Sequence, residues 1–307
     1  MQRVTSSMLN SQLLLNLNRN AQRMSESQIQ MSTGRKINKP SDDPVGITYS
    51  LRYRGELASN EQYQKNVDSA ISWLDFNDTM LNQSGDVMQR VRELTVQASN
   101  GTNPQSALDS IKAEIGELKN QLVDIANSKF NGKYIFNGEQ YDVKPYDFPV
   151  GADGKIDTSE AINIKTDTGV IQYAVGEMVQ LPINTTGEEV IGSSTEIDNV
   201  FIMLDRIMEQ LTGSRLEELS GELANIDTRI EKMLSVRSEI GAKTNRIELM
   251  QGRLGDMNVN LTELQSKTED ADYAELIMKS KIQENIYNAS LSAGAKIIQP
   301  SLVDFLR

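Results

Sequence analysis

The sequence has 307 residues, no cysteine and no histidine, and a formal net charge of −12. Without cysteine there is no disulfide, thiol nucleophile or thiolate metal site, and without histidine the commonest general base and metal ligand are missing. The acidic excess, 43 acidic against 31 basic residues, disfavours a broad contact with nucleic acid. We therefore expect a structural or binding protein that is not an enzyme and carries no cofactor or metal.

The N-terminal segment, residues 1–39, is basic, with six Lys and Arg residues against one Glu. Its hydrophobic residues follow a helical spacing that includes Met8, Leu17, Met24 and Met31. It lacks the uninterrupted apolar stretch of a cleaved signal peptide, and nothing in the chain reaches the ~18 apolar residues of a membrane span. Taken alone, these features predict a cytoplasmic protein.

The adjacent acids Asp42 and Asp43 precede Pro44. Neighbouring residues do not share a face, and no third ligand follows at a metal-binding spacing. We interpret Asp43 as the N-cap of a helix that has Pro44 at its first position.

Two amphipathic helices are predicted in the first half, one marked by hydrophobic residues between Val67 and Leu94 and one between Leu108 and Ile125. Asn100-Gly101 is expected to stop the first helix, and Asn103 to cap the second with Pro104 at its first position.

Residues 138–199 follow a different pattern, with turn residues and alternating hydrophobic residues that predict short strands. The expected strands include Lys133 to Phe136 just before this segment, Ile162 with Ile164, and two further alternating runs at 171–175 and 179–183. The segment holds 12 acidic and three basic residues, which favours a solvated, outward-facing β-rich insertion.

The second half predicts a helix over 197–211 and then a long helix. Hydrophobic residues recur at a seven-residue spacing, which indicates a seam packed against other helices; they are Leu219, Ile226, Met233, Ile240, Ile247, Leu254 and Leu261. A last amphipathic segment carries Ile282, Ile286, Ala293 and Ile297. Hydrophobic stripes at both chain ends suggest pairing of the terminal helices with each other and with neighbouring molecules.

Segment 32–46 reads Ser-Thr-Gly-Arg-Lys-Ile-Asn-Lys-Pro-Ser-Asp-Asp-Pro-Val-Gly, and it closely resembles the N-terminal motif of the bacterial flagellin superfamily. The similarity continues in segments 66–74, 92–98, 240–248 and 302–307. Segments 3–8, 131–138 and 186–191 are more similar to the subunits that join hook and filament than to the filament subunit.

This resemblance implies an elongated, mainly α-helical bundle formed by the N- and C-terminal halves, with a β-rich insertion. The implied organisation places terminal helices at 1–45 and 266–307, the bundle at 46–137 and 200–265, and the insertion at 138–199. The motif loop would include Gly34, Pro40, Asp42, Asp43 and Pro44. The assembly surface would include Met8, Leu17, Met24, Met31, Ile282, Ile286, Ala293, Ile297 and Phe305.

The implied function is that of an extracellular structural subunit of the flagellum, exported through the flagellar secretion channel without a cleaved signal. Its implied partners are a hook-associated protein on the hook side, flagellin on the filament side, further copies of itself in a ring, and an export chaperone. Three alternatives remain open: the filament subunit itself, an enzyme domain in the insertion, and a cytoplasmic coiled-coil adaptor.

Overall fold

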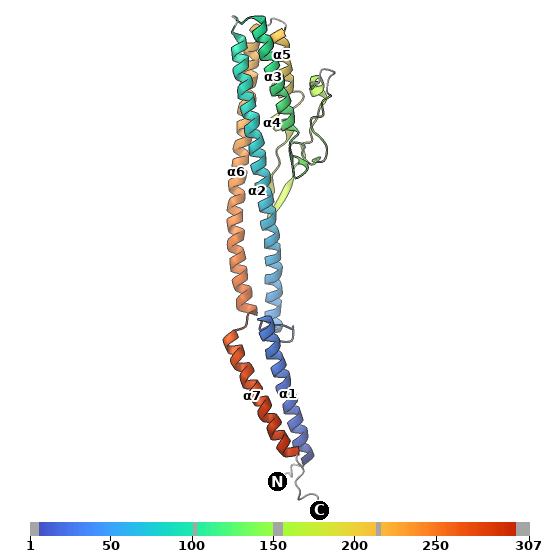
Figure 1. Ribbon diagram of the computed structural model, residues 1–307, viewed down its shortest axis with the longest axis vertical. Coiled ribbons are helices and arrows are strands. Elements are labelled where there is room, and N and C mark those ends of the chain that lie inside the picture. The colour runs from blue at the N-terminus through green and yellow to red at the C-terminus, as the bar shows by residue number, and fades with distance from the viewer. Residues whose placement is uncertain (1–5, 101–102, 150–155, 213–215, 299–307) are drawn as a thin grey trace, which may run out of the picture. The chain divides into compact units, whose positions relative to one another are not determined.

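The computed structural model describes residues 6–100, 103–149, 156–212 and 216–298 (Figure 1). The chain forms two compact units. Unit 1 comprises residues 1–59 and 257–307, and unit 2 comprises residues 60–256. Two long helices, α2 (Pro44–Ser99) and α6 (Leu219–Glu269), each contribute residues to both units.

Unit 1 contains α1 (Ser6–Thr33) and α7 (Tyr273–Ile298), which lie side by side as an antiparallel pair. The start of α2 and the end of α6 complete this unit. It therefore brings together the first and last helices of the chain.

Unit 2 is built on the C-terminal part of α2 and the N-terminal part of α6, with α3 (Gln105–Ala126) packed against α5 (Val200–Thr212). The short helices α4 (Gly187–Val190), η1 (Ser159–Asn163) and η2 (Leu216–Glu218) lie in the connections. Two antiparallel two-stranded sheets complete the unit: β1 (Lys129–Phe130) with β2 (Lys133–Tyr134), and β3 (Gln172–Gly176) with β4 (Val179–Pro182). The expected mainly helical fold with a small β-rich insertion is confirmed.

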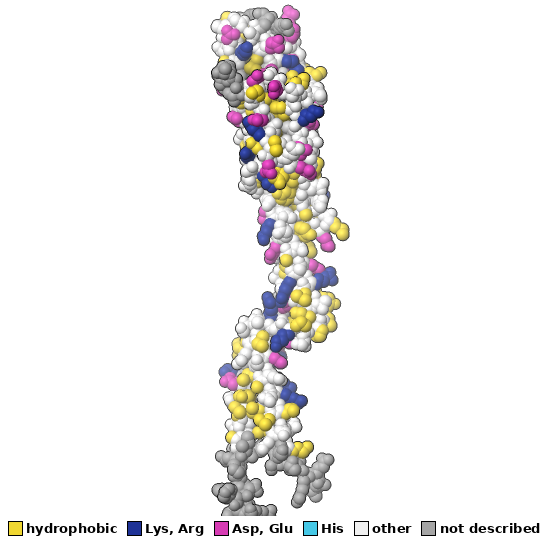
Figure 2. Space-filling view, turned by 90° about the vertical axis from the view of Figure 1, so that its right-hand side faces the viewer, with side chains coloured by type: hydrophobic (Ala, Val, Ile, Leu, Met, Phe, Trp, Pro, Cys, Tyr) yellow, Lys and Arg dark blue, Asp and Glu magenta, His cyan; other side chains and the backbone are white. Residues whose placement is uncertain are grey.

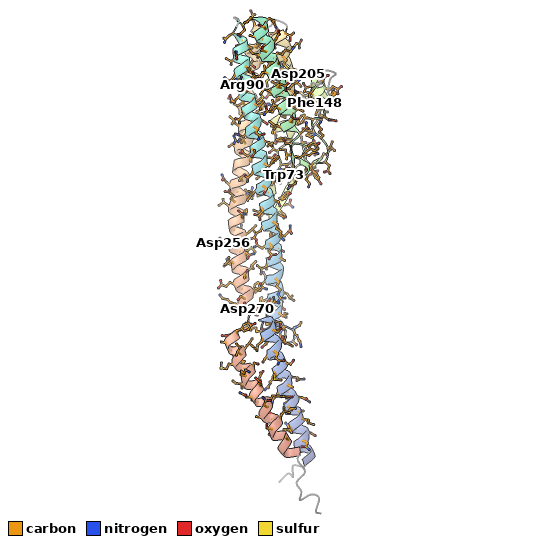
Figure 3. All side chains as sticks on the ribbon, viewed as in Figure 1. Trp73, Arg90, Phe148, Asp205, Asp256 and Asp270 are labelled. Atoms are coloured by element: carbon orange, nitrogen blue, oxygen red, sulfur yellow. The ribbon has the colours of Figure 1, made fainter. Side chains whose placement is uncertain are left out.

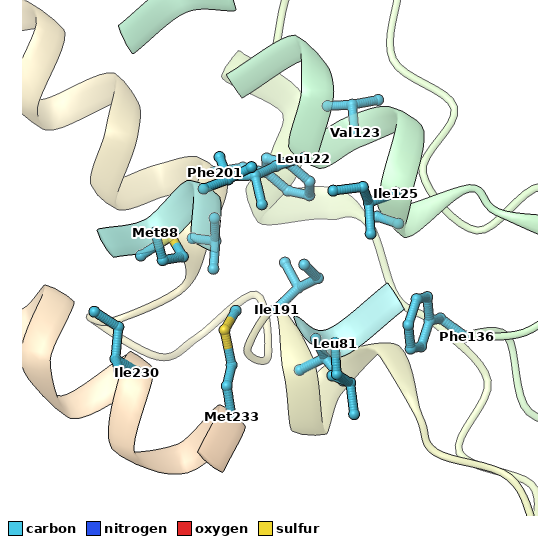
Figure 4. Packing of buried hydrophobic residues seen from close by; sticks show 14 of the residues in the cluster. Leu81, Met88, Leu122, Val123, Ile125, Phe136, Ile191, Phe201, Ile230 and Met233 are labelled. Atoms are coloured by element: carbon cyan, nitrogen blue, oxygen red, sulfur yellow. The ribbon is translucent and has the colours of Figure 1, made fainter. Parts of the chain in front are cut away.

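The seven residues predicted at a seven-residue spacing along α6 are all buried, with exposed fractions between 0% and 6%. Within unit 2 they pack against the corresponding stripe of α2, which includes Leu81 and Met88 (Figure 4). The seam is flanked by ion pairs such as Arg92–Asp227 and Arg237–Asp78. Such a two-helix seam is favoured because each stripe alone would expose its apolar residues to water.

The insertion packs on the bundle through part of its own hydrophobic residues. Ile183 and Val190 are at most 1% exposed and belong to the same hydrophobic cluster as the bundle helices, as does Ile191 in Figure 4. Within the insertion, Thr186 and Glu189 form a reciprocal capping box at the start of α4. The insertion therefore shares the hydrophobic core of unit 2.

Local structure differs from the sequence expectation at three places. Ile162 lies in the 3-10 helix η1 and not in a strand, and the strand expected over Lys133 to Phe136 is only two residues long. Pro104, not Asn103, occupies the N-cap position of α3, and the Asn103 amide donates back to carbonyl oxygens of the preceding turn. The predicted stop at Gly101 lies outside the described residues.

Candidate assembly interface

Three side-chain hydrogen bonds link α7 to α1. The Ser27 hydroxyl donates to Gln283 at 2.7 Å, and the Asn20 amide donates to the Ser290 hydroxyl at 3.4 Å. Tyr273 adds a hydrogen bond from its hydroxyl to the carbonyl oxygen of Met31 at 2.8 Å. These bonds fix the register of the pair, but polar contacts of this kind add little net stability because water competes for them.

The α1–α7 pair buries few hydrophobic side chains. Among the described residues of the two helices, Leu276 is the only large hydrophobic residue that is buried, at 6% exposed. Unit 2, in contrast, contains nearly the whole hydrophobic core of the chain. Burial of apolar surface is the main favourable term in folding, so the terminal helices have weak support within their own chain.

The structure divides the predicted assembly residues into two groups. Leu17, Met24 and Met31 are partly buried on α1, whereas Ile282 and Ile286 on α7 remain 52% and 47% exposed.

At the chain ends, Met8 is 65% exposed and Ala293 is also exposed. The side chain of Ile297 and the whole of Phe305 lie outside the described part of the chain. The α7 stripe is therefore directed away from its α1 partner over the part that the structure describes.

Unit 1 exposes large hydrophobic residues along all four of its helical segments, and hydrophobic side chains are visible on its surface in Figure 2. The most exposed of them are Met8, Leu14, Val45, Leu51, Val259, Tyr273, Met278 and Ile282, each above 50%. This many exposed apolar residues on α1, α7, the start of α2 and the end of α6 is typical of a surface that other protein chains cover.

The motif loop at residues 34–43 connects α1 to α2. Gly34 ends α1 with a φ of +70°, and its N–H donates to the carbonyl oxygen of Gln30, which is the αL type of helix end that favours glycine. Pro40 lies in a turn closed by a hydrogen bond from the Asp42 N–H to the Lys39 carbonyl. The loop is therefore a built structure and not a loose linker.

The two acids of the motif each satisfy backbone groups. Asp42 accepts hydrogen bonds from the N–H groups of Asn38 and Lys39 at 2.9 and 2.8 Å, which hold the pKa of its carboxyl below the usual value. Asp43 accepts from the N–H groups of Val45 and Gly46, so the geometry predicted for the N-cap of α2 is present.

The loop is fastened to the junction of α6 and α7. Arg35 forms an antiparallel bridge with Asp270, which is labelled in Figure 3, and the Lys36 N–H donates to the Glu269 carbonyl oxygen at 2.7 Å. The Ala271 N–H returns a hydrogen bond to the carbonyl oxygen of Gly34 at 3.0 Å. Two connections that are far apart in the sequence are thus joined through their backbones.

The side chain of Glu269 is the centre of this contact, and it is 1% exposed. Its carboxylate accepts a bidentate pair of hydrogen bonds from Arg54 at 2.8 and 2.6 Å and a hydrogen bond from the Ser50 hydroxyl, and it forms an ion pair with Arg35 at 3.2 Å. We call Arg35, Ser50, Arg54 and Glu269 the Glu269 clasp.

Burial of Glu269 by itself disfavours the charged carboxylate and raises its pKa. The hydrogen bonds from Arg54 and Ser50 and the charges of Arg54 and Arg35 outweigh this effect, so the pKa of Glu269 lies below its usual value. The carboxylate is therefore charged at neutral pH and holds all three partners.

No sequence pattern predicts the Glu269 clasp. Ser50, Arg54 and Glu269 carry no local signal, because Glu269 meets them across more than 210 residues of chain. The structure also requires glycine at position 46, because a Cβ atom there would lie 2.6 Å from Cδ1 of the buried Ile37. The requirement for glycine at position 46 comes from the packing of the preceding loop on the start of α2, which the sequence does not reveal.

Within the described ranges, no group of three or more Asp or Glu residues could hold a metal ion. In the same part of the chain, every helix falls short of the length and apolar character that crossing a bilayer requires.

Paired terminal helices with exposed hydrophobic residues, two long helices and a bundle with a small insertion define a class of mainly α-helical protein. Comparison with known proteins specifies this class. Residues 4–141 match the family described as the bacterial flagellin N-terminal helical region, and residues 223–306 match the bacterial flagellin C-terminal helical region. The chain therefore belongs to the bacterial flagellin family, as the sequence motifs predicted.

Two relatives are similar over nearly the whole chain. A flagellin of Bacillus subtilis is 29% identical over 274 residues, covering 84% of this chain and 85% of the relative. The flagellar hook-associated protein 3 of Escherichia coli is 27% identical over 278 residues, covering 86% and 87%.

Solved structures share the fold. A flagellar hook-associated protein from Vibrio parahaemolyticus aligns with a TM-score of 0.64 at 19% identity, covering 75% of this chain and all of the other. The flagellar hook associated protein-3 of Legionella pneumophila aligns with a TM-score of 0.61 at 18% identity, covering 71% and 98%.

Proposed function

We propose that this chain is a structural subunit of the bacterial flagellum that joins the hook to the flagellin filament. It has no catalytic role in this proposal and needs no cofactor. Its function is to pack, and the terminal helices α1 and α7 complete their packing only against neighbouring subunits.

The observation that carries the proposal is the contrast between the two units. Unit 2 has its own core, whereas α1 and α7 bury one large hydrophobic residue among those described and expose Met8, Ile282 and Ile286. Ordering a residue costs about 1–2 kcal/mol of backbone entropy, and burying a large aliphatic side chain returns about 1.5–3 kcal/mol. Neighbouring subunits supply the missing burial, so the helices become fully ordered on assembly.

The place at the hook–filament junction is supported by the relatives that carry the name hook-associated protein 3, together with the fold shared with hook-associated proteins. In this position the chain contacts a hook-associated protein on one side, flagellin on the other, and its own copies around the axis. Export through the flagellar secretion channel, without a cleaved signal and with the help of a chaperone, brings it to the cell exterior.

The filament subunit is the second candidate, because a Bacillus subtilis flagellin is as similar to the chain as the hook-associated proteins are. The two functions differ in copy number and in position along the flagellum. A junction subunit forms a short segment, whereas a filament subunit adds to itself over a great length.

Deletion of the gene in the bacterium that makes the chain separates the two candidates. Loss of a junction subunit leaves hooks without filaments while flagellin is released into the medium, and expression of the intact chain restores filaments. Hooks without filaments and with no released flagellin would instead assign the chain as the filament subunit. Normal filaments in the deletion strain would contradict both.

A further inference from the structure

Asparagine is followed by glycine three times in the sequence, at residues 100–101, 131–132 and 137–138. In such a pair the backbone nitrogen of the glycine can attack Cγ of the asparagine side chain, and ammonia leaves as a succinimide ring closes. Glycine permits this attack because it has no Cβ that would shield its nitrogen. Gly101 lies outside the described residues, so the structure allows a comparison of the second and third pairs.

The pair Asn131-Gly132 forms the two-residue turn between β1 and β2. Asn131 has a φ of +49° and Gly132 a φ of +80°, and positive φ at both positions is typical of a type I′ hairpin turn. Both residues are exposed, and nothing lies within 4 Å of the place where a Cβ of Gly132 would be. Over the part of the chain that the structure describes, no hydrogen bond involves the Asn131 side chain or the Gly132 N–H. The pair is therefore accessible to water, and its conformation can change at little cost because each strand of the hairpin has only two residues.

The pair Asn137-Gly138 has the same local sequence but is tightly held. Asn137 is 4% exposed, and its side-chain amide donates to the carbonyl oxygens of Gln140 and Val143 at 3.1 and 3.0 Å. Its amide oxygen accepts a hydrogen bond from the Asp167 N–H at 3.0 Å. Gly138 is also closely packed, since a Cβ there would lie 2.5 Å from the carbonyl oxygen of Asp167. The Asn137 side chain therefore cannot turn toward the following nitrogen without breaking these contacts.

Reaction at Asn131 would alter the turn and its surroundings. Hydrolysis of the succinimide gives aspartate, which adds a negative charge, or isoaspartate, which also adds a carbon atom to the backbone. The two-residue turn has a fixed backbone length, so isoaspartate shifts the strands that the turn joins. Phe130 directly precedes the turn, and its ring packs on Trp73 and Phe76 with centroid distances of 5.8 and 5.2 Å. We therefore expect isoaspartate at position 131 to displace Phe130 from Trp73.

We propose that Asn131 is a modification site that deamidates through a succinimide formed with Gly132, whereas the contacts of Asn137 protect it. The Gly132 nitrogen forms a bond to Cγ of Asn131 and loses its proton, and the bond between Cγ and Nδ2 breaks. Nδ2 takes up this proton and leaves as ammonia. One water molecule then opens the ring at either of its carbonyl groups. The reaction requires only water, so it is independent of the proposed function and of any partner.

Peptide mapping of the purified full chain by mass spectrometry tests the proposal. The folded chain is incubated in mildly alkaline buffer, because the attacking nitrogen must lose its proton, and samples are digested with trypsin. Trypsin cleaves after lysine, so Lys129 and Lys133 place the two asparagines on separate peptides. We expect Asn131 to convert to the acid forms at least about tenfold faster than Asn137. Equal rates at the two positions, or faster conversion of Asn137, would overturn the proposal.

The same chain unfolded in guanidinium chloride is the matched control. Each of the two pairs follows a phenylalanine, so their local sequences are nearly the same once the fold is removed. We expect Asn131 and Asn137 to react at similar rates in the unfolded chain. A rate at Asn137 that stays low after unfolding would overturn the protection assigned to its contacts. Reaction of Asn131 in the unfolded chain alone would show that the turn prevents the attack, which would also overturn the proposal.

Asn131→Gln provides a second test, because the longer side chain would have to close a larger ring and does not react on the same timescale. The fluorescence of Trp73, the single tryptophan, is recorded for the wild type and the variant, each before and after the same incubation. We expect the emission to change in the wild type and to stay constant in the variant, since only the wild type forms isoaspartate beside Phe130. Equal changes in the two chains would overturn the displacement of Phe130.

Discussion

Glu269 carries the contact between the motif loop and the α6–α7 junction. Glu269→Gln keeps the shape of the side chain but removes the charge that Arg35 and Arg54 share. Hydrogen bonds to charged groups contribute about 1.5–3 kcal/mol, so we expect the clasp to lose stability by an amount in this range. Amide hydrogen exchange in residues 34–43 should quicken accordingly, whereas Glu275→Gln, which breaks only an exposed pair with Lys279, should leave it unchanged.

The lowered pKa of Glu269 fixes the direction of its pH dependence. The folded pKa lies below the unfolded one, so the contribution is complete above the ordinary value of 4.5 and is lost as the pH falls through the folded pKa. Protection of residues 34–43, corrected for intrinsic exchange rates, should therefore decrease in this acidic range in the wild type. A Glu269→Gln variant with the same acid-induced decrease would contradict this assignment.

Gly192 and Gly252 test the same substitution in opposite surroundings. Gly192 has a φ of +102°, and its Cβ would lie 2.5 Å from Nη2 of the fully buried Arg229, which pairs with Glu196 and Asp198. We expect Gly192→Ala to destabilise unit 2 by about 2–4 kcal/mol, because strain and disruption of a buried ion pair combine.

Gly252 lies inside α6 with open space around it, so Gly252→Ala should stabilise the protein by about 0.5–1 kcal/mol. Urea unfolding followed by the single tryptophan, Trp73, measures the Gly192 effect, and circular dichroism of the helices measures the Gly252 effect. Equal effects of the two substitutions would contradict the role given to Gly192.

At the scale of the helices, Ile286 on the exposed stripe of α7 is the sharpest test of the assembly surface. Ile286→Asp places a charge on a side chain that is 47% exposed in the isolated chain, so folding of unit 2 should not change. We expect incorporation into flagella to fall at least tenfold, because the charge would be buried against a neighbour. Asn288→Asp adds the same charge to an exposed polar position of α7 and serves as the matched control. Filament growth by Ile286→Asp at the level of the control would exclude this face from assembly.

The helices could be predicted from the sequence where their stability depends on periodic burial. The seven-residue spacing from Leu219 to Leu261 marks a buried seam because each of these residues faces a partner helix. The spacing of Ile282 and Ile286 predicts the helix equally well but cannot say which neighbour it faces, and in the structure it faces away from α1. Ile162 was wrongly assigned to a strand because two alternating residues are too few to distinguish a strand from a 3-10 turn.

The Glu269 clasp depends on contacts between residues far apart in the sequence, which sequence patterns do not predict. Asp43 could be assigned from its immediate neighbours, since a cap bonds the residues that follow it. Glu269 and Arg54 could not, because their meeting depends on how two long helices are paired and no periodicity encodes a single ion pair. Family motifs marked the loop as important, and only the structure shows what it is fastened to.

At the scale of the whole molecule, the chain divides by the amount of hydrophobic core. Residues 60–256 contain the Trp73 environment and nearly all of the buried cluster. We expect a fragment of these residues to fold by itself, with a Trp73 fluorescence midpoint within a few degrees of that of the full chain. A fragment that unfolds far below the full chain would show that the terminal unit supports the bundle.

On the proposed function, α1 and α7 become fully ordered through contacts with neighbouring subunits. Amide hydrogen exchange of residues 6–33 and 273–298, measured in the free chain and in isolated hook–filament junctions, tests it most directly. We predict weak protection in the free chain, far below that of the α2 core at residues 67–98, and an increase of at least about 100-fold on assembly. Protection of the terminal helices in the free chain equal to that of residues 67–98 would contradict the claim.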